Sequence, residues 1–164
     1  MLGWYLLLTK PRQEELALQN LQQQGYCCYM PRMQQQKIAG KQLKLIEVPL
    51  FPRYIFVELD SSGNGKSWAP LRSTYGVSTL VRFGEQPAVV GREIITELKR
   101  RESTQGVITL FNSGDRVTIV DGPLMGIEGV FQMQDAEQRC LVLLHFLQRR
   151  TLLRIDPAVL RKIS

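Results

Sequence analysis

The sequence predicts an α+β fold, in which a mostly antiparallel sheet is covered by helices and is followed by a small β-rich C-terminal domain. Strand-like and helix-like segments alternate without strict repetition over residues 1–102. The pattern changes near residue 110, where short apolar runs separated by turn residues begin. With 164 residues the chain has room for two unequal domains. We predict domains over residues 1–102 and 114–164, joined by a linker over residues 103–113.

The first elements are a strand and a helix. An apolar run predicts a buried strand over Trp4–Thr9. Pro11 and Gly25 then bracket one helix, because proline suits the first helical turn and glycine commonly follows the last. The expected inner side of this helix contains Glu14, Ala17, Leu18 and Leu21. An adjacent polar stripe, next to Lys10, contains Gln13, Asn20 and Gln24. Such a stripe is either a binding surface or a solvated face.

A short strand over Cys27–Pro31 precedes a predicted hairpin, whose strands lie within residues 34–48 around Ala39-Gly40-Lys41. The charge of this hairpin is one-sided. Its basic residues Arg32, Lys37, Lys41 and Lys44 are accompanied by a single acidic residue, Glu47. This arm either reaches a phosphate backbone or is a sheet edge that lysines keep soluble.

The next strand, Arg53–Leu59, is apolar on both faces and follows the prolines of Pro49-Leu50-Phe51-Pro52. One face is expected to cover the core. The second face either packs against helices of the same chain or is exposed for a partner, and sequence periodicity does not separate these two possibilities.

The remaining elements follow in order along the chain. Residues 60–67 predict a flexible connection, Trp68–Ser73 a short helix, and Val77–Arg82 and Ala88–Val90 two strands around Phe83-Gly84-Glu85. A second long helix over Arg92–Glu102 is expected to bury Ile94, Ile95 and Leu98. In the C-terminal domain, short runs predict the strands of a small barrel. They are Arg116–Val120, Ile127–Met133, Cys140–Leu147 and Thr151–Ile155.

The composition favours a binding protein over an enzyme. A net charge of +6 and a pI of about 9.5 favour an anionic partner such as nucleic acid, although many proteins with a merely solvated surface are equally basic. The single histidine, His145, lies in an apolar run. The sequence has no nucleophile elbow, phosphate-binding glycine loop or metal-ligand cluster, so we predict no catalytic residues, no metal and no cofactor.

The cysteines and the N-terminal run bear on location. Cys27, Cys28 and Cys140 have no metal-ligand spacing, and we expect reduced thiols at or near the core of a cytoplasmic protein. The apolar run Leu2–Leu8 is too short to span a bilayer, and we expect no membrane partner. A monomer is the expected oligomeric state.

Two sets of motifs resemble the NusG family of transcription elongation factors. The glycine-punctuated run from Gly114 to Val130 resembles the KOW motif of that family and of ribosomal proteins. Trp4-Tyr5-Leu6-Leu7, the run Pro49–Val57 and Tyr75-Gly76-Val77 resemble the NusG N-terminal domain in order and spacing. The resemblance covers nearly the whole chain, and it implies a NusG-type N-terminal α/β sandwich followed by a KOW domain.

Within this family, three features are more similar to the specialised RfaH branch than to the general NusG proteins. They are the runs Val81–Gly84 and Pro87–Val90, the Lys37–Lys41 hairpin and the compact length. The resemblance implies a non-enzymatic factor that binds the clamp helices of RNA polymerase through Phe51, Tyr54 and Phe56. Anchoring there disfavours clamp opening, which suppresses pausing at selected operons. The KOW domain is expected to link the polymerase to the small ribosomal subunit.

The resemblance also implies contact with the single-stranded non-template DNA. The matching positions are Lys10, Gln13, Asn20, Arg72, Thr74 and Tyr75. Asn20 replaces a histidine of the RfaH branch and Tyr75 replaces an arginine, so stacking on the ring would take the place of some base contacts. Ser67-Trp68-Ala69 stands where that branch has a His-Thr-Thr run contacting the far side of the polymerase cleft.

Two further functions stay open from the sequence: a general NusG factor that also recruits Rho, and a ribosome-associated KOW protein that binds RNA. The C-terminal domain is also open, because in the RfaH branch it can form a helical hairpin that masks the polymerase-binding patch and then refold to a barrel. Pro123 lies inside the first helix of such a hairpin, where proline costs about 3 kcal/mol. We therefore predict the barrel as the resting form and retain the autoinhibited hairpin as the alternative.

Overall fold

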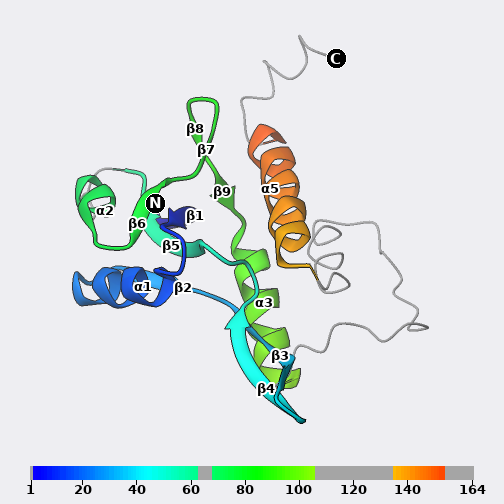
Figure 1. Cartoon of the computed structure of the whole chain (residues 1–164). Helices are drawn as coiled ribbons and strands as arrows, with labels where there is room; N and C mark the ends of the chain where they lie inside the picture. The colour runs from blue at the N-terminus through cyan, green and yellow to red at the C-terminus, as the bar shows by residue number, and fades with distance from the viewer. Residues whose placement is uncertain (1, 63–67, 106–134, 154–164) are drawn as a thin grey trace. The chain divides into compact units, whose positions relative to one another are not determined.

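The computed structural model describes residues 2–62, 68–105 and 135–153 (Figure 1). Contacts divide these residues into two compact units. The first contains residues 2–29, 53–62, 68–92 and 144–153, and the second contains residues 30–52, 93–105 and 135–143. Mixed helices and antiparallel sheets confirm the predicted α+β class.

A mostly antiparallel sheet forms the centre of the first unit. Strand β1 (Leu2–Thr9) pairs with β5 (Tyr54–Asp60) along its whole length, from Leu2 opposite Asp60 to Leu8 opposite Tyr54. Strand β2 (Cys27–Tyr29) lies on the other side of β5. The edge of β1 away from β5 pairs with both β6 (Val77–Leu80) and β9 (Val89–Val90).

The central strands are buried on both faces, a pattern typical of continuous apolar runs, whereas the sequence left the second face of Arg53–Leu59 open. In β1 the consecutive residues Trp4, Tyr5, Leu6 and Leu7 are all buried. In β5 the same holds for Ile55, Phe56 and Val57. Successive side chains of a strand point to opposite faces, so neither strand has an open apolar face in this structure.

Helix α1 (Glu14–Gln23) buries Ala17 and Leu21, while Glu14 and Leu18 are half-buried. Its predicted start at Pro11 is wrong. Arg12 has a φ of 62°, a left-handed conformation that a helix does not continue through, so the helix begins after it.

Three short elements complete the described part of the first unit. Helix α2 (Ala69–Ser73) confirms the predicted short helix, with Pro70 in its first turn. Strands β7 (Arg82–Phe83) and β8 (Gln86–Pro87) form a small hairpin that the sequence did not predict as separate strands. Its turn contains Gly84, which has a φ of 66°.

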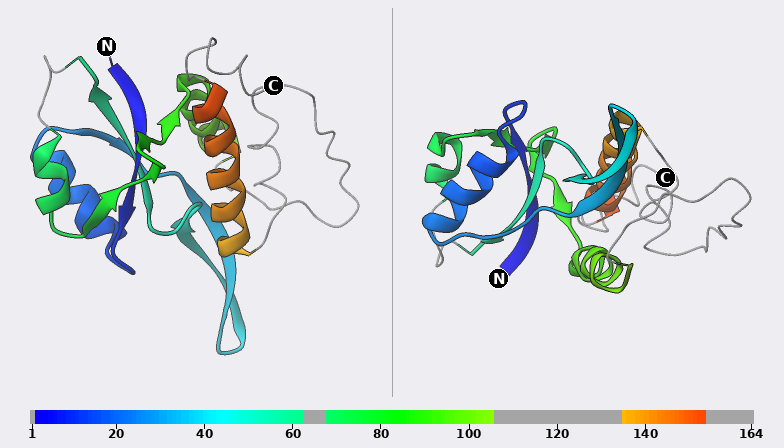
Figure 2. Two further views of the ribbon diagram at one scale, coloured as in Figure 1. Left: turned by 90° about the horizontal axis from the view of Figure 1, so that it is seen from above. Right: turned by 60° about the horizontal axis from the view of Figure 1, so that its bottom comes forward.

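The second unit contains the predicted hairpin. Strands β3 (Arg32–Ala39) and β4 (Gln42–Pro49) pair in continuous antiparallel register, from Arg32 opposite Pro49 to Ala39 opposite Gln42. Figure 2 shows them as a narrow twisted ribbon with the turn at its far end. Gly40, in that turn, has a φ of 66°, a conformation that favours glycine in a two-residue hairpin turn.

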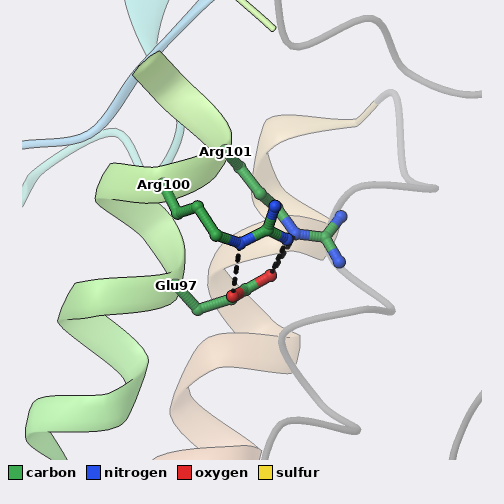
Figure 3. A network of polar contacts seen from close by, with 3 residues as sticks. All are labelled: Glu97, Arg100 and Arg101. Atoms are coloured by element: carbon green, nitrogen blue, oxygen red, sulfur yellow. Dashed lines mark hydrogen bonds and ion pairs between the residues drawn. The ribbon is translucent and has the colours of Figure 1, made fainter. Parts of the chain in front are cut away.

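Helix α3 (Arg92–Gln105) buries Ile94, Ile95 and Leu98, as predicted. It runs three residues further than expected, so residues 103–105 are helical where the sequence predicted the start of a linker. The Glu97 carboxylate accepts hydrogen bonds from Arg100 at 2.6 Å and from Arg101 at 3.0 Å (Figure 3). The hydrogen bond from Arg100 holds the pKa of Glu97 at about 2, below its usual 4.5.

The C-terminal prediction is wrong where the structure tests it. Helix α5 (Ala136–Leu153) occupies the run Cys140–Leu147, which was predicted as a barrel strand, and the beginning of Thr151–Ile155. Its buried side chains, Arg139, Leu143, Phe146 and Leu147, recur at helical spacing. The predicted strands Arg116–Val120 and Ile127–Met133 lie outside the described residues. Among the described residues, no helix is both long and apolar enough to cross a membrane.

Candidate functional site

Two segments of the first unit meet beside the end of β1. The Lys10 backbone N–H donates to the Gly76 carbonyl at 2.8 Å. Gly76 has a φ of 89°, and a Cβ placed on it would lie 2.8 Å from the backbone nitrogen of Ala17 in α1. Only glycine permits this approach without strain. The close packing holds residues 74–76 against α1, the helix that carries the predicted polar stripe.

A side-chain hydrogen bond makes a second connection between these segments. Gln24, at the end of α1, donates from Nε2 to the Thr74 hydroxyl at 2.8 Å, and that hydroxyl donates to the Pro70 carbonyl at 2.8 Å. Thr74 is buried, so its hydroxyl is committed to these internal bonds. Of the predicted DNA-binding residues, Thr74 is therefore placed to position its neighbours.

We call the following group of residues the polar surface, of which Thr74 is buried: Lys10, Gln13, Asn20, Gln24, Arg72, Thr74 and Tyr75. Tyr75 is 79% exposed, and Lys10 and Arg72 are also exposed. Gln13 and Asn20 are half-buried, with the Asn20 amide donating to the Leu16 carbonyl at 2.9 Å. The polar surface combines cations, amides and one open ring, which are the groups used to hold phosphates and stack bases.

Sequence reasoning missed Arg53 as a neighbour of this surface. Its Nε donates to the Thr9 carbonyl at 3.1 Å, and the Thr9 N–H donates to the Arg53 carbonyl at 2.7 Å, next to Lys10 in the chain. Arg53 has a φ of 75°, which is uncommon for a residue with a side chain. The sequence offered no signal for this conformation beyond the preceding proline.

The second candidate set, Phe51, Tyr54 and Phe56, is called the aromatic patch. Phe51 is 1% exposed and Phe56 is 0% exposed, whereas Tyr54 is half-buried. Phe56 stacks with Tyr29, its register partner on β2, with ring centroids 6.2 Å apart. Phe51 and Phe56 are thus each buried in this structure, and Tyr54 is the most accessible member of the set.

Helix α5 contacts the segment that contains Phe51. The Arg139 Nε donates to the Leu50 carbonyl at 2.8 Å, and the Cys140 thiol donates to the Pro52 carbonyl at 3.6 Å. Arg139 is 2% exposed, and this burial lowers the pKa of its guanidinium. A buried arginine was not predicted, because charged residues are rarely buried without a partner. Here the Leu50 carbonyl provides one.

Two of the described thiols, Cys28 and Cys140, are poorly suited to chemistry. Burial raises the pKa of Cys28 to about 12 and that of Cys140 to about 11, so both are protonated at neutral pH. Cys27 is exposed, which corrects its expected place at or near the core. No group of metal-ligating side chains occurs within the described residues.

The polar surface and the aromatic patch both fall within a region that matches a known family. The family model described as Transcription termination factor nusG matches residues 2–99, more than half of the chain. The chain belongs to the NusG family. Members of this family are transcription factors and not enzymes.

Individual NusG proteins are similar over most of their length. The Transcription termination/antitermination protein NusG of Thermus thermophilus is 23% identical over 174 residues, covering 93% of this chain and 94% of the relative. The NusG of Deinococcus radiodurans is 24% identical over 183 residues, covering 93% and 95%. A solved structure described as "Domain interaction in Thermotoga maritima NusG" is 20% identical, covering 76% of this chain and 75% of the other, with a TM-score of 0.44.

Proposed function

We propose that this NusG-family protein is a specialised elongation and antitermination factor of the RfaH type. It binds the clamp helices of RNA polymerase through the aromatic patch and the non-template DNA strand through the polar surface. It thereby suppresses pausing at selected operons, and residues 114–164, as a KOW domain, connect the polymerase to the small ribosomal subunit.

The contact between α5 and the segment Leu50–Pro52 carries this proposal. A surface of aromatic rings that serves only as core has no need of a separate C-terminal helix at its flank. In the RfaH branch, by resemblance, a helical C-terminal domain masks the patch and later leaves it. The hydrogen bond from Arg139 to Leu50 and the closed state of Phe51 support the same arrangement here. For the C-terminal domain, we therefore favour the autoinhibited helical hairpin over the barrel as the resting form.

The proposed mechanism is differential binding between two states of the protein. While α5 contacts Leu50–Pro52, the polymerase clamp competes with it for the aromatic patch. The polar surface is open in the same state, so DNA is the first ligand to be engaged. Contact with the exposed strand of a paused complex would bring the patch close to the clamp, which raises the effective concentration of the second contact.

Two tyrosines separate the two proposed contacts. Tyr54→Ala in the aromatic patch is expected to lower retention of RNA polymerase elongation complexes by roughly tenfold, since aromatic anchors carry a large share of interface energy. Tyr75→Ala on the polar surface is the matched control. It should retain the polymerase and reduce crosslinking to the non-template strand. Unchanged retention by a folded Tyr54→Ala protein would remove the aromatic patch from the proposal.

A general NusG role is the second candidate, and the similarity to NusG proteins along 93% of the chain favours it. Genome-wide occupancy distinguishes the two roles. Enrichment on a few long operons supports the specialised factor, whereas presence on nearly every transcribed gene, together with Rho binding, supports the general one.

A further inference from the structure

Helix α2 packs against strand β6 (Figure 1), and beside this contact lies a pocket of about 330 Å³. Its volume is at the lower end of the range of roughly 300–1,000 Å³ that small-molecule sites occupy. Leu71 and Leu80 are buried and give the pocket an apolar wall, whereas Arg72 and Arg82 are exposed. We call it the arginine pocket, and it is lined by Trp68, Ala69, Leu71, Arg72, Leu80 and Arg82.

Trp68 departs from the RfaH branch and forms one wall of this pocket. Its indole N–H, the only hydrogen-bond donor of the ring, donates to the Asp60 carbonyl at 3.1 Å. The ring also packs edge to face with Tyr5, with centroids 4.9 Å apart and an angle of 61° between the planes. These two contacts hold the ring in place without a ligand. Trp68 therefore offers stacking, and not a further hydrogen bond, to a molecule that enters the pocket.

The arginine pocket is positively charged. Arg72 and Arg82 contribute two guanidinium groups, and none of the lining residues is acidic. Arg82 donates to the Glu85 carbonyl at 3.3 Å, which is a neutral acceptor. Among the described residues, no carboxylate forms an ion pair with either arginine. Because a guanidinium carries five N–H donors in a planar fork, both side chains retain donors that suit a phosphate group.

A fitting ligand must match both the charge and the apolar walls of the pocket. A phosphate monoester carries a charge of about −1.5 to −2 at pH 7, which two arginines neutralise, whereas a phosphodiester within a strand carries a single charge. Inorganic phosphate would leave the indole and the two leucines uncovered. A nucleobase covers them, because every base has a flat π-face that stacks on an aromatic ring.

We propose that the arginine pocket binds a free nucleoside 5′-monophosphate. The base stacks on Trp68 beside the leucine wall, while Arg72 from α2 and Arg82 from β7 hold the phosphate. This site goes beyond the proposed function, because it requires neither RNA polymerase nor DNA.

Isothermal titration calorimetry of the full-length protein tests this proposal with AMP as the probe. The wild type should bind AMP roughly tenfold more tightly than adenosine, which lacks the phosphate. It should also bind AMP roughly tenfold more tightly than inorganic phosphate, which lacks the base. Phosphotyrosine combines a smaller ring with the same phosphate, and tighter binding of phosphotyrosine than of AMP would overturn the proposal in favour of a phosphopeptide.

Two substitutions separate the phosphate contact from the stacking contact. Arg82→Gln should weaken AMP binding by roughly tenfold and leave adenosine binding unchanged. Trp68→Leu should weaken the binding of AMP and adenosine alike, by roughly tenfold for one lost stack. Arg12→Gln is the matched control, since this exposed arginine lies outside the pocket and its loss changes the net charge equally. Circular dichroism checks each fold, and Arg82→Gln, at an exposed position, gives the decisive result if Trp68→Leu fails to fold.

The outcomes separate this inference from the proposed function. A wild type that binds AMP no better than inorganic phosphate holds an adventitious ion only, which overturns the nucleotide site. Equal losses in Arg82→Gln and Arg12→Gln overturn it too, because general electrostatics would then explain the binding. If Arg82→Gln weakens binding to single-stranded DNA and not to AMP, the pocket serves a strand and the proposal fails. Tyr54→Ala, which tests polymerase retention, should keep AMP binding unchanged, so either proposal can fail while the other stands.

Discussion

The polar surface and the aromatic patch differ in their readiness for a partner. The polar surface is already assembled, because the Lys10 to Gly76 hydrogen bond joins its two segments and Tyr75 is exposed. In the aromatic patch, by contrast, Phe51 and Phe56 are buried, and Arg139 of α5 is bonded to the adjacent Leu50. On the proposed function, the contrast means that only the aromatic patch requires a conformational change, so regulation would act on polymerase binding.

The largest effect is expected from a substitution that separates the two segments of the polar surface. Gly76→Ala forces a side chain into a left-handed conformation and against the Ala17 backbone. It should lower the free energy of unfolding by about 3 kcal/mol and abolish single-strand binding. Urea denaturation measures the change. Gly84→Ala, at φ 66° with open space around it, is the control and should cost about 1 kcal/mol. Equal costs would contradict the close approach to α1.

The closed state of the aromatic patch can be weakened directly. Arg139→Ala removes a charged donor and leaves the Leu50 carbonyl without it, at a cost of about 2 kcal/mol to the closed state. Polymerase binding should tighten by up to about 30-fold, because less energy is needed to open the patch. Arg149→Ala, on an exposed position of the same helix, is the control and should change neither the stability of the closed state nor the affinity for polymerase. Surface plasmon resonance with immobilised polymerase measures the affinity. Weaker binding by Arg139→Ala would contradict the proposed masking of the aromatic patch by α5.

The next prediction concerns Tyr75, the exposed ring of the polar surface. Tyr75→Ala should weaken single-strand binding by about 1–2 kcal/mol, the range for one base stacked on an aromatic side chain, and leave stability unchanged. Tyr75→Phe should bind like the wild type, since stacking does not require the hydroxyl. Fluorescence anisotropy on single strands is the readout, and equal losses in both variants would show that the hydroxyl matters instead of the ring.

The smallest effect concerns the ion pairs of α3, which include no residue of either surface. Because the pKa of Glu97 is lowered from 4.5 to about 2, its contribution to stability is present above pH 4.5 and is lost as the pH falls towards 2. Arg100 is 57% exposed, so water screens the pair and Glu97→Gln should cost only about 0.5 kcal/mol at pH 7. Thermal unfolding at pH 7 and pH 3 measures the stability lost on Glu97→Gln, with Glu85→Gln as control. A cost that grows at pH 3 would reverse the expected sign.

Prediction from the sequence succeeded where a segment's residue pattern fits one kind of secondary structure only. The uninterrupted apolar run of β1 and the glycine turn of the β3–β4 hairpin each favour one local structure, and both elements were predicted. The run Cys140–Leu147 failed because it is apolar at every position but one, so alternation and helical spacing fit it equally well. The structure decides through Arg139, Leu143 and Leu147, which recur every four residues and are buried.

The candidate sites were predictable to a different degree. Residue types and the family resemblance pointed to the segments around Lys10 and Tyr75, which the structure brings together. The buried hydroxyl of Thr74 and the contact of Arg139 with Leu50 could not be predicted. Each depends on which segments far apart in the sequence become neighbours, and no local pattern encodes this.

Hydrogen–deuterium exchange of the full-length protein, with and without RNA polymerase, tests the masking of the aromatic patch most directly. We predict that the amides of α5 lose protection when polymerase is added, while those of residues 50–57 remain protected by the new partner. If α5 keeps its full protection in a complex that contains bound polymerase, the helix does not leave the patch and the account is contradicted.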